Sequence, residues 1–366
     1  MSSSSINKKM KKPSKSISYP SLPYDLVLSC LARIPRSYYL SLTLVSKNFQ
    51  SLLASPELYK TRSLLGRTES CLYVCLRLDT HSNPCWFTLY LKQHKKKNST
   101  GNLLVPIPSP KFSSPQWSSI VAVDSTIYEI GGLIDETRSS RVSILDCRYH
   151  TWHEAPSMQA ARHSPAANFL DGKIYVAGGG EEENSLNWME VFDPKIQTWE
   201  SLPSSGAEIC TSKVYQSTKV DEKIYMYGLN GMAYDPKEGT CEAVEWMPWF
   251  ASFCCVIDNL AYWYKDGEFI WCDTKVNVWR SLKGLEGLPK FVSYSCVKLA
   301  DYGGNMMVLW DRYAPGSKYK EKVIWCAEIE LKRCNNEEVL GKVKWFDAVL
   351  TVPKSYEFVR VLVATV

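Results

Sequence analysis

The feature that most constrains this chain is an internal repeat. IYEIGG at 127–132 returns as IYVAGG at 174–179, and ILDCRYHTWHEAP returns as VFDPKIQTWESLP. Asp146 and Asp193 are 47 positions apart, as are Trp152 and Trp199. Several landmarks at one offset indicate a true repeat. A repeat of this length is a supersecondary unit that buries its core by stacking on its neighbours.

Two weaker copies follow at shorter intervals. IYMYG at 224–228 leads to AYDPKEGTCEAV, and LAYWYKDGEFIWCDTKVNVWRSL contains Asp273 and Trp279. Each copy consists of an apolar strand, an Ile-Tyr strand ending in glycine, a strand ending in Asp, and a Thr-Trp strand. A unit of four short strands with this period is typical of a propeller blade.

The repeated residues have structural explanations. Glycine allows turns with positive φ and close backbone approach, Trp packs between adjacent units, and Asp-Pro makes the turn between the third and fourth strands. The residues predicted to act in this way are Gly131, Gly132, Trp152, Gly178, Gly179, Trp199 and Trp279.

The repeats predict a closed ring. LYVCLRL, WFTLYL and LLVPIP supply three strands of one further blade, and the terminal run SYEFVRVLVATV supplies the missing one. Pairing the C-terminus with the first blade removes the exposed edges of an open ring. We therefore expect six blades, with five and seven as alternatives. The other five blades are assigned to residues 117–156, 163–203, 210–247, 250–284 and 291–352.

Residues 20–65 are the stretch with sustained helical character. Pro23 suits a first helical turn, Pro35 ends that helix, and the pair at 55–56 is a helix start. The run at 37–54 repeats apolar residues at intervals of three and four, which predicts an amphipathic helix. A module of some 45 residues buries little surface alone, so we expect it to bind a partner.

Three segments of this region resemble an F-box: Leu-Pro-x-Asp-Leu at 22–26, Leu-x-x-Val-Ser-Lys-x-Phe at 42–49, and Ser-Pro-Glu-Leu-Tyr at 55–59. The repeats resemble kelch motifs, although single glycines replace the pair in the weaker copies and Cys241 replaces the Trp in one. The order of the two, together with WFTLYL, LLVPIPSP and WSSIVAVDSTIYEIGG, is similar to the plant family of F-box/kelch-repeat proteins.

The predicted fold class is thus a small all-α F-box module followed by an all-β kelch-type propeller of about six blades. Its parts are a disordered basic tail (1–18), the F-box (19–66) and the propeller (70–366), closed by the C-terminal strand.

The resemblance implies a non-catalytic substrate-recognition subunit of a Skp-cullin-F-box ubiquitin ligase. The F-box would bind a Skp-type adaptor, and through it a cullin-RING scaffold, while the propeller binds an unknown target protein through loops at one face. By position in the F-box motif, the residues that would make apolar contacts with the adaptor, or support those contacts, are Leu22, Pro23, Leu26, Leu28, Leu31, Leu40, Val45 and Phe49. Asp25 and Lys47 would lie at the rim of this surface.

Charge and cysteine usage argue against other partners. The formal net charge of +5 equals the charge of the five lysines of the tail, so the rest of the chain is neutral and no nucleic-acid partner is expected. No stretch has the length of a membrane span, and no secretory signal precedes the 13 cysteines, which lie mostly in apolar runs. These features predict the cytoplasm or the nucleus, and KKMKKPSK at 8–15 is a candidate nuclear signal.

The sequence gives little support for a metal site or an enzymatic function. Cys147, His150 and His153 form C-x-x-H-x-x-H, but they align with a turn and a strand of the next repeat, so neither a metal nor a cofactor is expected. Two alternatives to the ligase subunit remain. One is a propeller scaffold, for instance cytoskeletal, and the other is a copper enzyme of galactose-oxidase type, for which a convincing ligand set is missing. Candidate target-binding loops are the insertions at 80–86, 92–102, 181–187 and 312–321.

Overall fold

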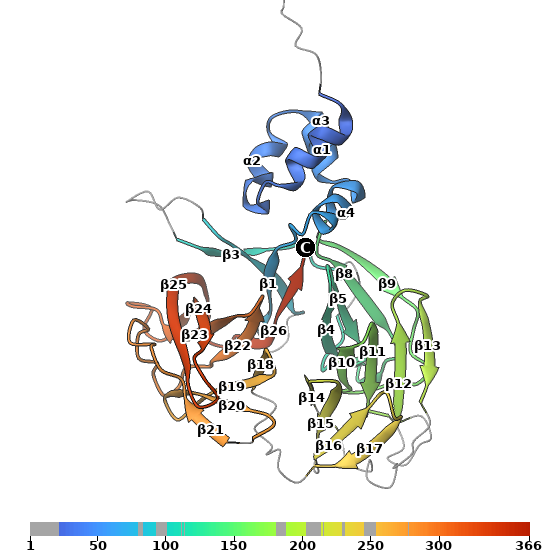
Figure 1. The fold of residues 1–366 in the computed structure, drawn as a ribbon, viewed down its shortest axis with the longest axis vertical. Coiled ribbons are helices and arrows are strands. Elements are labelled where there is room, and N and C mark those ends of the chain that lie inside the picture. The colour runs from blue at the N-terminus through green and yellow to red at the C-terminus, as the bar shows by residue number, and fades with distance from the viewer. Residues whose placement is uncertain are drawn as a thin grey trace, which may run out of the picture.

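The computed structural model describes residues 22–79, 83–92, 101–110, 112, 114–180, 188–202, 214, 216–228, 231–244, 254–276 and 278–366. The helices form a small module at the N-terminal end, and the strands form the rest (Figure 1). This confirms the predicted order of an all-α module and an all-β propeller. The predicted tail at 1–18, the insertion at 181–187, and residues 80–82 and 93–100 of the insertions at 80–86 and 92–102 lie outside the described residues. The helices are α1 (Tyr24–Ala32), η1 (Arg36–Tyr38), α2 (Tyr39–Thr43), α3 (Lys47–Leu53) and α4 (Pro56–Leu64).

Within the described residues, the strands form six four-stranded antiparallel sheets, which are the six predicted blades. A short hairpin, β6 (Leu133–Ile134) with β7 (Thr137–Arg138), extends the second blade. From the inner to the outer strand, the first blade consists of β26 (Glu357–Thr365), β1 (Ser70–Arg77), β2 (Cys85–Tyr90) and β3 (Leu103–Pro106), and the second of β4 (Ser119–Val123), β5 (Thr126–Ile130), β8 (Val142–Asp146) and β9 (Thr151–Ala155). The third consists of β10 (Ala166–Leu170), β11 (Lys173–Ala177), β12 (Met189–Asp193) and β13 (Thr198–Ser201), and the fourth of β14 (Gln216–Val220), β15 (Lys223–Tyr227), β16 (Gly231–Asp235) and β17 (Thr240–Ala243). The fifth consists of β18 (Cys255–Ile257), β19 (Leu260–Lys265), β20 (Glu268–Asp273) and β21 (Val278–Ser281), and the sixth of β22 (Lys298–Tyr302), β23 (Asn305–Tyr313), β24 (Glu321–Arg333) and β25 (Val339–Pro353).

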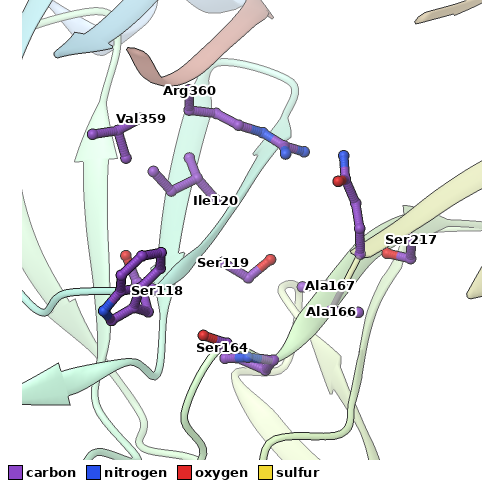
Figure 2. A pocket seen from close by; sticks show the side chains of 12 residues that line it. Ser118, Ser119, Ile120, Ser164, Ala166, Ala167, Ser217, Val359 and Arg360 are labelled. Atoms are coloured by element: carbon purple, nitrogen blue, oxygen red, sulfur yellow. The ribbon is translucent and has the colours of Figure 1, made fainter. Parts of the chain in front are cut away.

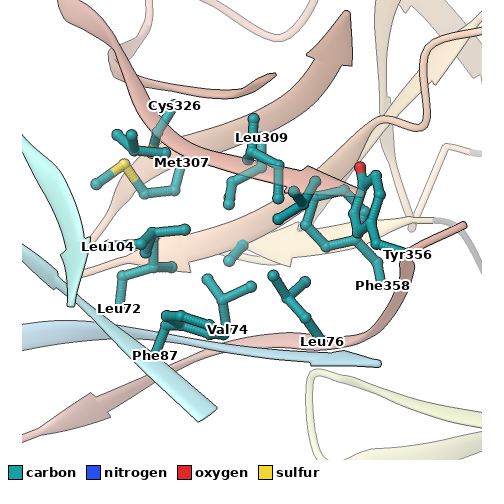
Figure 3. Close-up of a cluster of buried hydrophobic side chains, with 14 residues drawn as sticks. Leu72, Val74, Leu76, Phe87, Leu104, Met307, Leu309, Cys326, Tyr356 and Phe358 are labelled. Atoms are coloured by element: carbon teal, nitrogen blue, oxygen red, sulfur yellow. The ribbon is translucent and has the colours of Figure 1, made fainter. Parts of the chain in front are cut away.

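The ring is closed by the C-terminal strand. β26 pairs antiparallel with β1, so the first blade takes its inner strand from the end of the chain, as predicted. Behind this pairing, side chains of β1 and β2 pack on those of β23 and β24 in the sixth blade (Figure 3). Leu72, Val74 and Leu309 are fully buried there. Because the first and sixth blades share one hydrophobic core, closure rests on apolar burial as well as on backbone hydrogen bonds.

The Asp of each repeat holds the turn between the third and fourth strands. Its carboxylate accepts a hydrogen bond from the backbone N–H two residues later, an arrangement that stabilises a tight turn. This explains why Asp recurs where the flanking residues vary. In the four repeats, Arg148 N donates to Asp146 Oδ1 (2.9 Å), Lys195 N to Asp193 Oδ1 (2.8 Å), Lys237 N to Asp235 Oδ1 (3.0 Å), and Lys275 N to Asp273 Oδ1 (3.1 Å).

The repeated Trp residues connect neighbouring blades. The indole N–H of Trp152 donates to the carbonyl of Pro108, which follows the outer strand of the preceding blade (2.9 Å). Trp199 donates in the same way to Pro156 O, at 2.8 Å. Trp279 packs edge-on against Trp263 of its own blade, with ring centroids 6.2 Å apart.

The paired glycines allow the loops between blades to approach. All four have positive φ, and a Cβ on Gly179 would lie 2.3 Å from His163 O, while one on Gly132 would lie 2.5 Å from Gln116 O. At Gly131 and Gly178 there is more room, because an added Cβ would lie 3.0 and 3.1 Å from its nearest atom. The second glycine of each pair is therefore the position where a side chain does not fit.

One helix prediction is wrong. The run at 37–54 is not one amphipathic helix but η1, α2 and α3. The break comes at Ser46, whose hydroxyl accepts a hydrogen bond from Phe49 N (3.2 Å) and caps a new helix. Ser55 caps α4 in the same way through Leu58 N, with Pro56 at its first turn, as the sequence predicted.

Candidate functional site

Two groups of apolar side chains on the helical module are exposed. The first lies at the start of α1, where Leu22 is 63% and Leu26 53% exposed, with Tyr24 between them. The second lies at the corner between α2 and α3, where Leu44 is 87% and Val45 63% exposed. Apolar side chains exposed in groups on so small a module indicate a surface for a protein partner. We call these two groups the exposed apolar set.

The predicted adaptor-binding residues divide by burial. Pro23, Asp25 and Lys47 are exposed beside the exposed apolar set. Leu28 and Leu31 are buried in the core of the module, and Phe49 packs partly against that core. Leu28 and Leu31 therefore support the helices and do not reach a partner, whereas the side chain of Leu40 lies outside the described residues. Adaptor contact by the exposed residues stays a prediction.

The sequence prediction did not include Tyr24 and Leu44, although both are exposed. Both could have been found because they are adjacent to predicted contact residues: Tyr24 is the variable position of Leu-Pro-x-Asp-Leu, and Leu44 directly precedes Val45. Once Ser46 is recognised as a helix cap, Leu44 and Val45 belong to the corner before the new helix, where side chains face outward.

A polar joint fixes the helical module to the propeller. Arg62 of α4 is 1% exposed, and its Nη1 donates to the carbonyls of Ala32 (3.2 Å) and Ile34 (2.8 Å). Its Nη2 pairs with Glu69 Oε1 at 2.5 Å, and the same oxygen accepts from Arg36 N at 3.0 Å. Glu69 thus connects two helices of the module just before β1 begins.

The module also contacts the second blade. Tyr59 donates to Arg148 O at 3.1 Å, and its ring packs edge-on against Tyr149 with centroids 5.4 Å apart. Arg36 Nη2 donates to Cys147 O at 3.1 Å. Burial raises the pKa of the Tyr59 phenol, which therefore remains a donor at physiological pH. These contacts all reach the turn between β8 and β9.

The residues of C-x-x-H-x-x-H lie in and beside this turn with separate partners. Cys147 is fully buried and contacts Leu145 O, and burial raises the pKa of its thiol to about 12. His150 Nε2 bonds with Tyr73 Oη at 3.0 Å, and burial, followed by the charge of Arg36, lowers the pKa of His150 to about 4. His153 bonds instead with Thr151. Within the described part of the chain, no group of three or more His, Cys, Asp or Glu residues could hold a metal ion.

Comparison with known proteins agrees with this architecture. A model of the F-box domain matches residues 20–61, and one of the FKB95 Kelch-repeats domain matches residues 86–350. Three curated relatives from Arabidopsis thaliana, named F-box/kelch-repeat proteins (one of them as putative), are 52%, 52% and 53% identical to this chain. The alignments cover 98%, 94% and 99% of this chain and 100%, 93% and 100% of the relatives. The chain belongs to the F-box/kelch-repeat family.

The helical module is accordingly the F-box, and the six sheets are a kelch propeller. An F-box combined with a kelch propeller is the domain organisation of substrate-adaptor subunits, in which one part binds the ligase and the other the target. The exposed apolar set lies on the F-box, and the polar joint determines how the F-box is held against the propeller.

None of the helices that the structure describes is long and apolar enough to cross a membrane.

Proposed function

We propose that this protein is the substrate-recognition subunit of a Skp-cullin-F-box ubiquitin ligase. The F-box binds a Skp-type adaptor and through it a cullin-RING scaffold, and the propeller binds a target protein that becomes ubiquitinated. The observation that carries the proposal is the exposed apolar set on an F-box whose core is complete without it. Such a subunit acts in the cytoplasm or the nucleus.

The energetics of the exposed apolar set support a binding role. Burying a Leu or Val side chain stabilises a contact by about 1.5–3 kcal/mol, and a few central anchors dominate the affinity of an interface. Leu22, Leu26, Leu44 and Val45 would each gain burial against an adaptor. Asp25 and Lys47, which are exposed next to them, would remain at the polar rim.

The mechanism is proximity. The subunit holds the target near the conjugating enzyme, so a target lysine meets the charged enzyme at high effective concentration. No residue of this chain need take part in the chemistry. The polar joint supports this role, because an F-box held at a fixed orientation restricts the positions that a bound target can take.

The test is co-purification of the full-length chain with a Skp-type adaptor. We expect the wild type to bind and the double variant Leu26→Asp/Val45→Asp to lose at least about 30-fold in affinity, because an anchor residue typically contributes 2 kcal/mol or more. An Asp at position 26 lies in the first turn of α1, which tolerates negative charge, and position 45 lies outside the helices.

Leu64→Asp is the matched control, because Leu64 is 79% exposed on α4 and lies outside the predicted contacts. It should bind the adaptor like the wild type. An adaptor that fails to bind the wild-type chain would remove the proposal, and full affinity in the double variant would remove the assignment of the surface.

A further inference from the structure

A pocket of about 150 Å³ lies between the inner strands of the propeller. Its lining comes from β4, β10, β14 and β26, which belong to four blades, and from the loops before β4 and β10. Figure 2 shows the Arg360 side chain extending from β26 and the Ser119 side chain lying in the same space. The pocket therefore belongs to the centre of the ring.

The pocket lies at the end of the inner strands away from the F-box. Its residues lie where β4, β10 and β14 begin, for example Ser119, Ala166 and Gln216. The F-box side is where inner strands end: Thr365 N donates to Asp124 O, after β4, at 2.8 Å, and Val366 pairs with Glu69 of the joint. A molecule in the pocket would therefore be held on the side of the propeller that faces away from the ligase.

The pocket contains hydrogen-bond donors without partners. The backbone of Arg360 pairs with that of Cys75, but its half-buried side chain makes no hydrogen bond and no ion pair to any described residue. Ser217 is 8% exposed, and its hydroxyl has no partner in the described structure. Ser119 also makes no side-chain hydrogen bond to a described residue, whereas the Ser118 hydroxyl is engaged by Glu129 Oε1 at 3.1 Å.

An unpaired guanidinium in this position is costly. Burial lowers the pKa of Arg360, which means that the surroundings disfavour its charge, yet an arginine remains protonated in proteins. The described lining offers no carboxylate to compensate it. A charge removed from water is stabilised by a partner of opposite sign that also accepts its hydrogen bonds. An anion is therefore the kind of ligand that this guanidinium would favour.

We propose that this pocket binds a carboxylate side chain, Asp or Glu, from a segment of the target protein. Arg360 would donate two parallel hydrogen bonds to the carboxylate, and Ser119 and Ser217 would add hydroxyl donors. The described lining holds a single cation, which matches the single charge of a carboxylate better than the greater charge of a phosphate. This inference rests on the proposed function in taking the ligand to be part of a target.

A phage-displayed library of random linear peptides, selected on the full-length chain, tests the proposal. We expect the selected peptides to be enriched in Asp or Glu at one position. Synthetic copies should bind Arg360→Gln at least tenfold more weakly than the wild type, and Arg360→Lys with an intermediate loss, because Lys keeps the charge but not the paired donors. Ser217→Ala should weaken binding a few-fold.

Arg138→Gln is the matched control, because it removes the same charge from an exposed position on β7 outside the pocket. It should bind the peptides like the wild type, and thermal melts should show Arg360→Gln to be folded. Peptides without an acidic position, or equal binding by Arg360→Gln, would overturn the proposal. Tighter binding of a phosphoserine peptide or of inorganic phosphate would replace the carboxylate with a phosphate and overturn it as well.

The two proposals fail separately. The peptide selection contains no adaptor, so its failure leaves the adaptor measurement standing. Loss of adaptor binding in turn would not change the dependence of peptide binding on Arg360.

Discussion

The third blade depends on one fully buried ion pair, and breaking it should destabilise the propeller strongly. Arg162, in the loop before β10, and Glu190 of β12 are both 0% exposed. The guanidinium reaches Glu190 Oε1 through Nε (3.1 Å) and Nη2 (2.8 Å), and its Nη1 donates to the carbonyls of Gly178 (2.8 Å) and Trp188 (3.0 Å). Glu190 also accepts the backbone N–H groups of residues 159 and 160.

Arg162→Met replaces the guanidinium with an apolar side chain and leaves the carboxylate of Glu190 buried without its cation. Removing one partner of a buried pair costs about 3–5 kcal/mol, because the remaining charge is uncompensated. Here Gly178 O also loses the Arg162 donor. We expect a loss near the upper end of that range. Against a total stability of roughly 5–15 kcal/mol for a protein domain, it would be a large fraction.

The assay is equilibrium denaturation of the full-length chain, followed by tryptophan fluorescence. If the loss of stability comes from the uncompensated charge of Glu190, adding Glu190→Gln to Arg162→Met should restore about 1 kcal/mol or more of the free energy of unfolding. Residues in one network typically couple by about 0.5–3 kcal/mol. Lys237→Met, which breaks the exposed pair between Lys237 and Glu222, should leave the midpoint nearly unchanged. A double variant that is no more stable than Arg162→Met would refute the reasoning.

Three further predictions concern other parts of the fold. Burial raises the pKa of Glu129 to about 7, above its unfolded value, so stability should fall as pH rises from about 4.5 through 7. Glu129→Gln should flatten that dependence, measured as denaturation midpoints at about pH 5 and 8. Gly179→Ala should destabilise more than Gly172→Ala, because both have positive φ but only Gly179 lacks space for a Cβ; thermal melts of equal midpoint would contradict this. Glu69→Ala should loosen the joint and speed tryptic cleavage after the exposed Arg67, while Glu357→Ala, which breaks an exposed pair with Arg77, should not.

The repeat made the propeller predictable because its landmarks have local causes. An Asp that closes a turn through an amide two residues later acts within its own hairpin, so the same letter recurs in every copy, from Asp146 to Asp273. A glycine with positive φ is equally local. The closing strand was predictable for a different reason: the first blade lacked one strand, and a single apolar run remained at the end of the chain.

The F-box surface was predictable only in part, because helical periodicity does not distinguish residues of the buried core from exposed residues that could contact a partner. Leu26 and Leu31 both fit an apolar face of α1, yet Leu26 is 53% exposed and Leu31 is 2% exposed. The difference depends on where α4 packs, which no local pattern encodes. Val45 fitted the periodicity of a helix that does not exist, since the cap at Ser46 ends that pattern.

Arg360 interrupts an apolar strand, which the repeat pattern alone does not explain. It is the charged residue within the apolar run FVRVLVATV, and strand pairing alone explains the apolar letters around it. Whether a cation on an inner strand lines the central pocket depends on the register of that strand and on the neighbouring blades. The pairing of Arg360 with Cys75 and the position of the pocket are both properties of the closed ring.

The joint shows why ring closure and F-box attachment are one problem. Glu69 N donates to Val366 O at 2.7 Å, and Val366 N donates to Glu69 O at 2.8 Å, so the backbone of Glu69 extends the pairing of β26 with β1. The side chain of the same residue holds Arg62 and the backbone N–H of Arg36 in the F-box. Displacing β26 would remove both the inner strand of the first blade and the backbone support of the joint. The orientation of the F-box therefore depends on the closure of the ring, through contacts between residues that lie about 300 positions apart in the sequence.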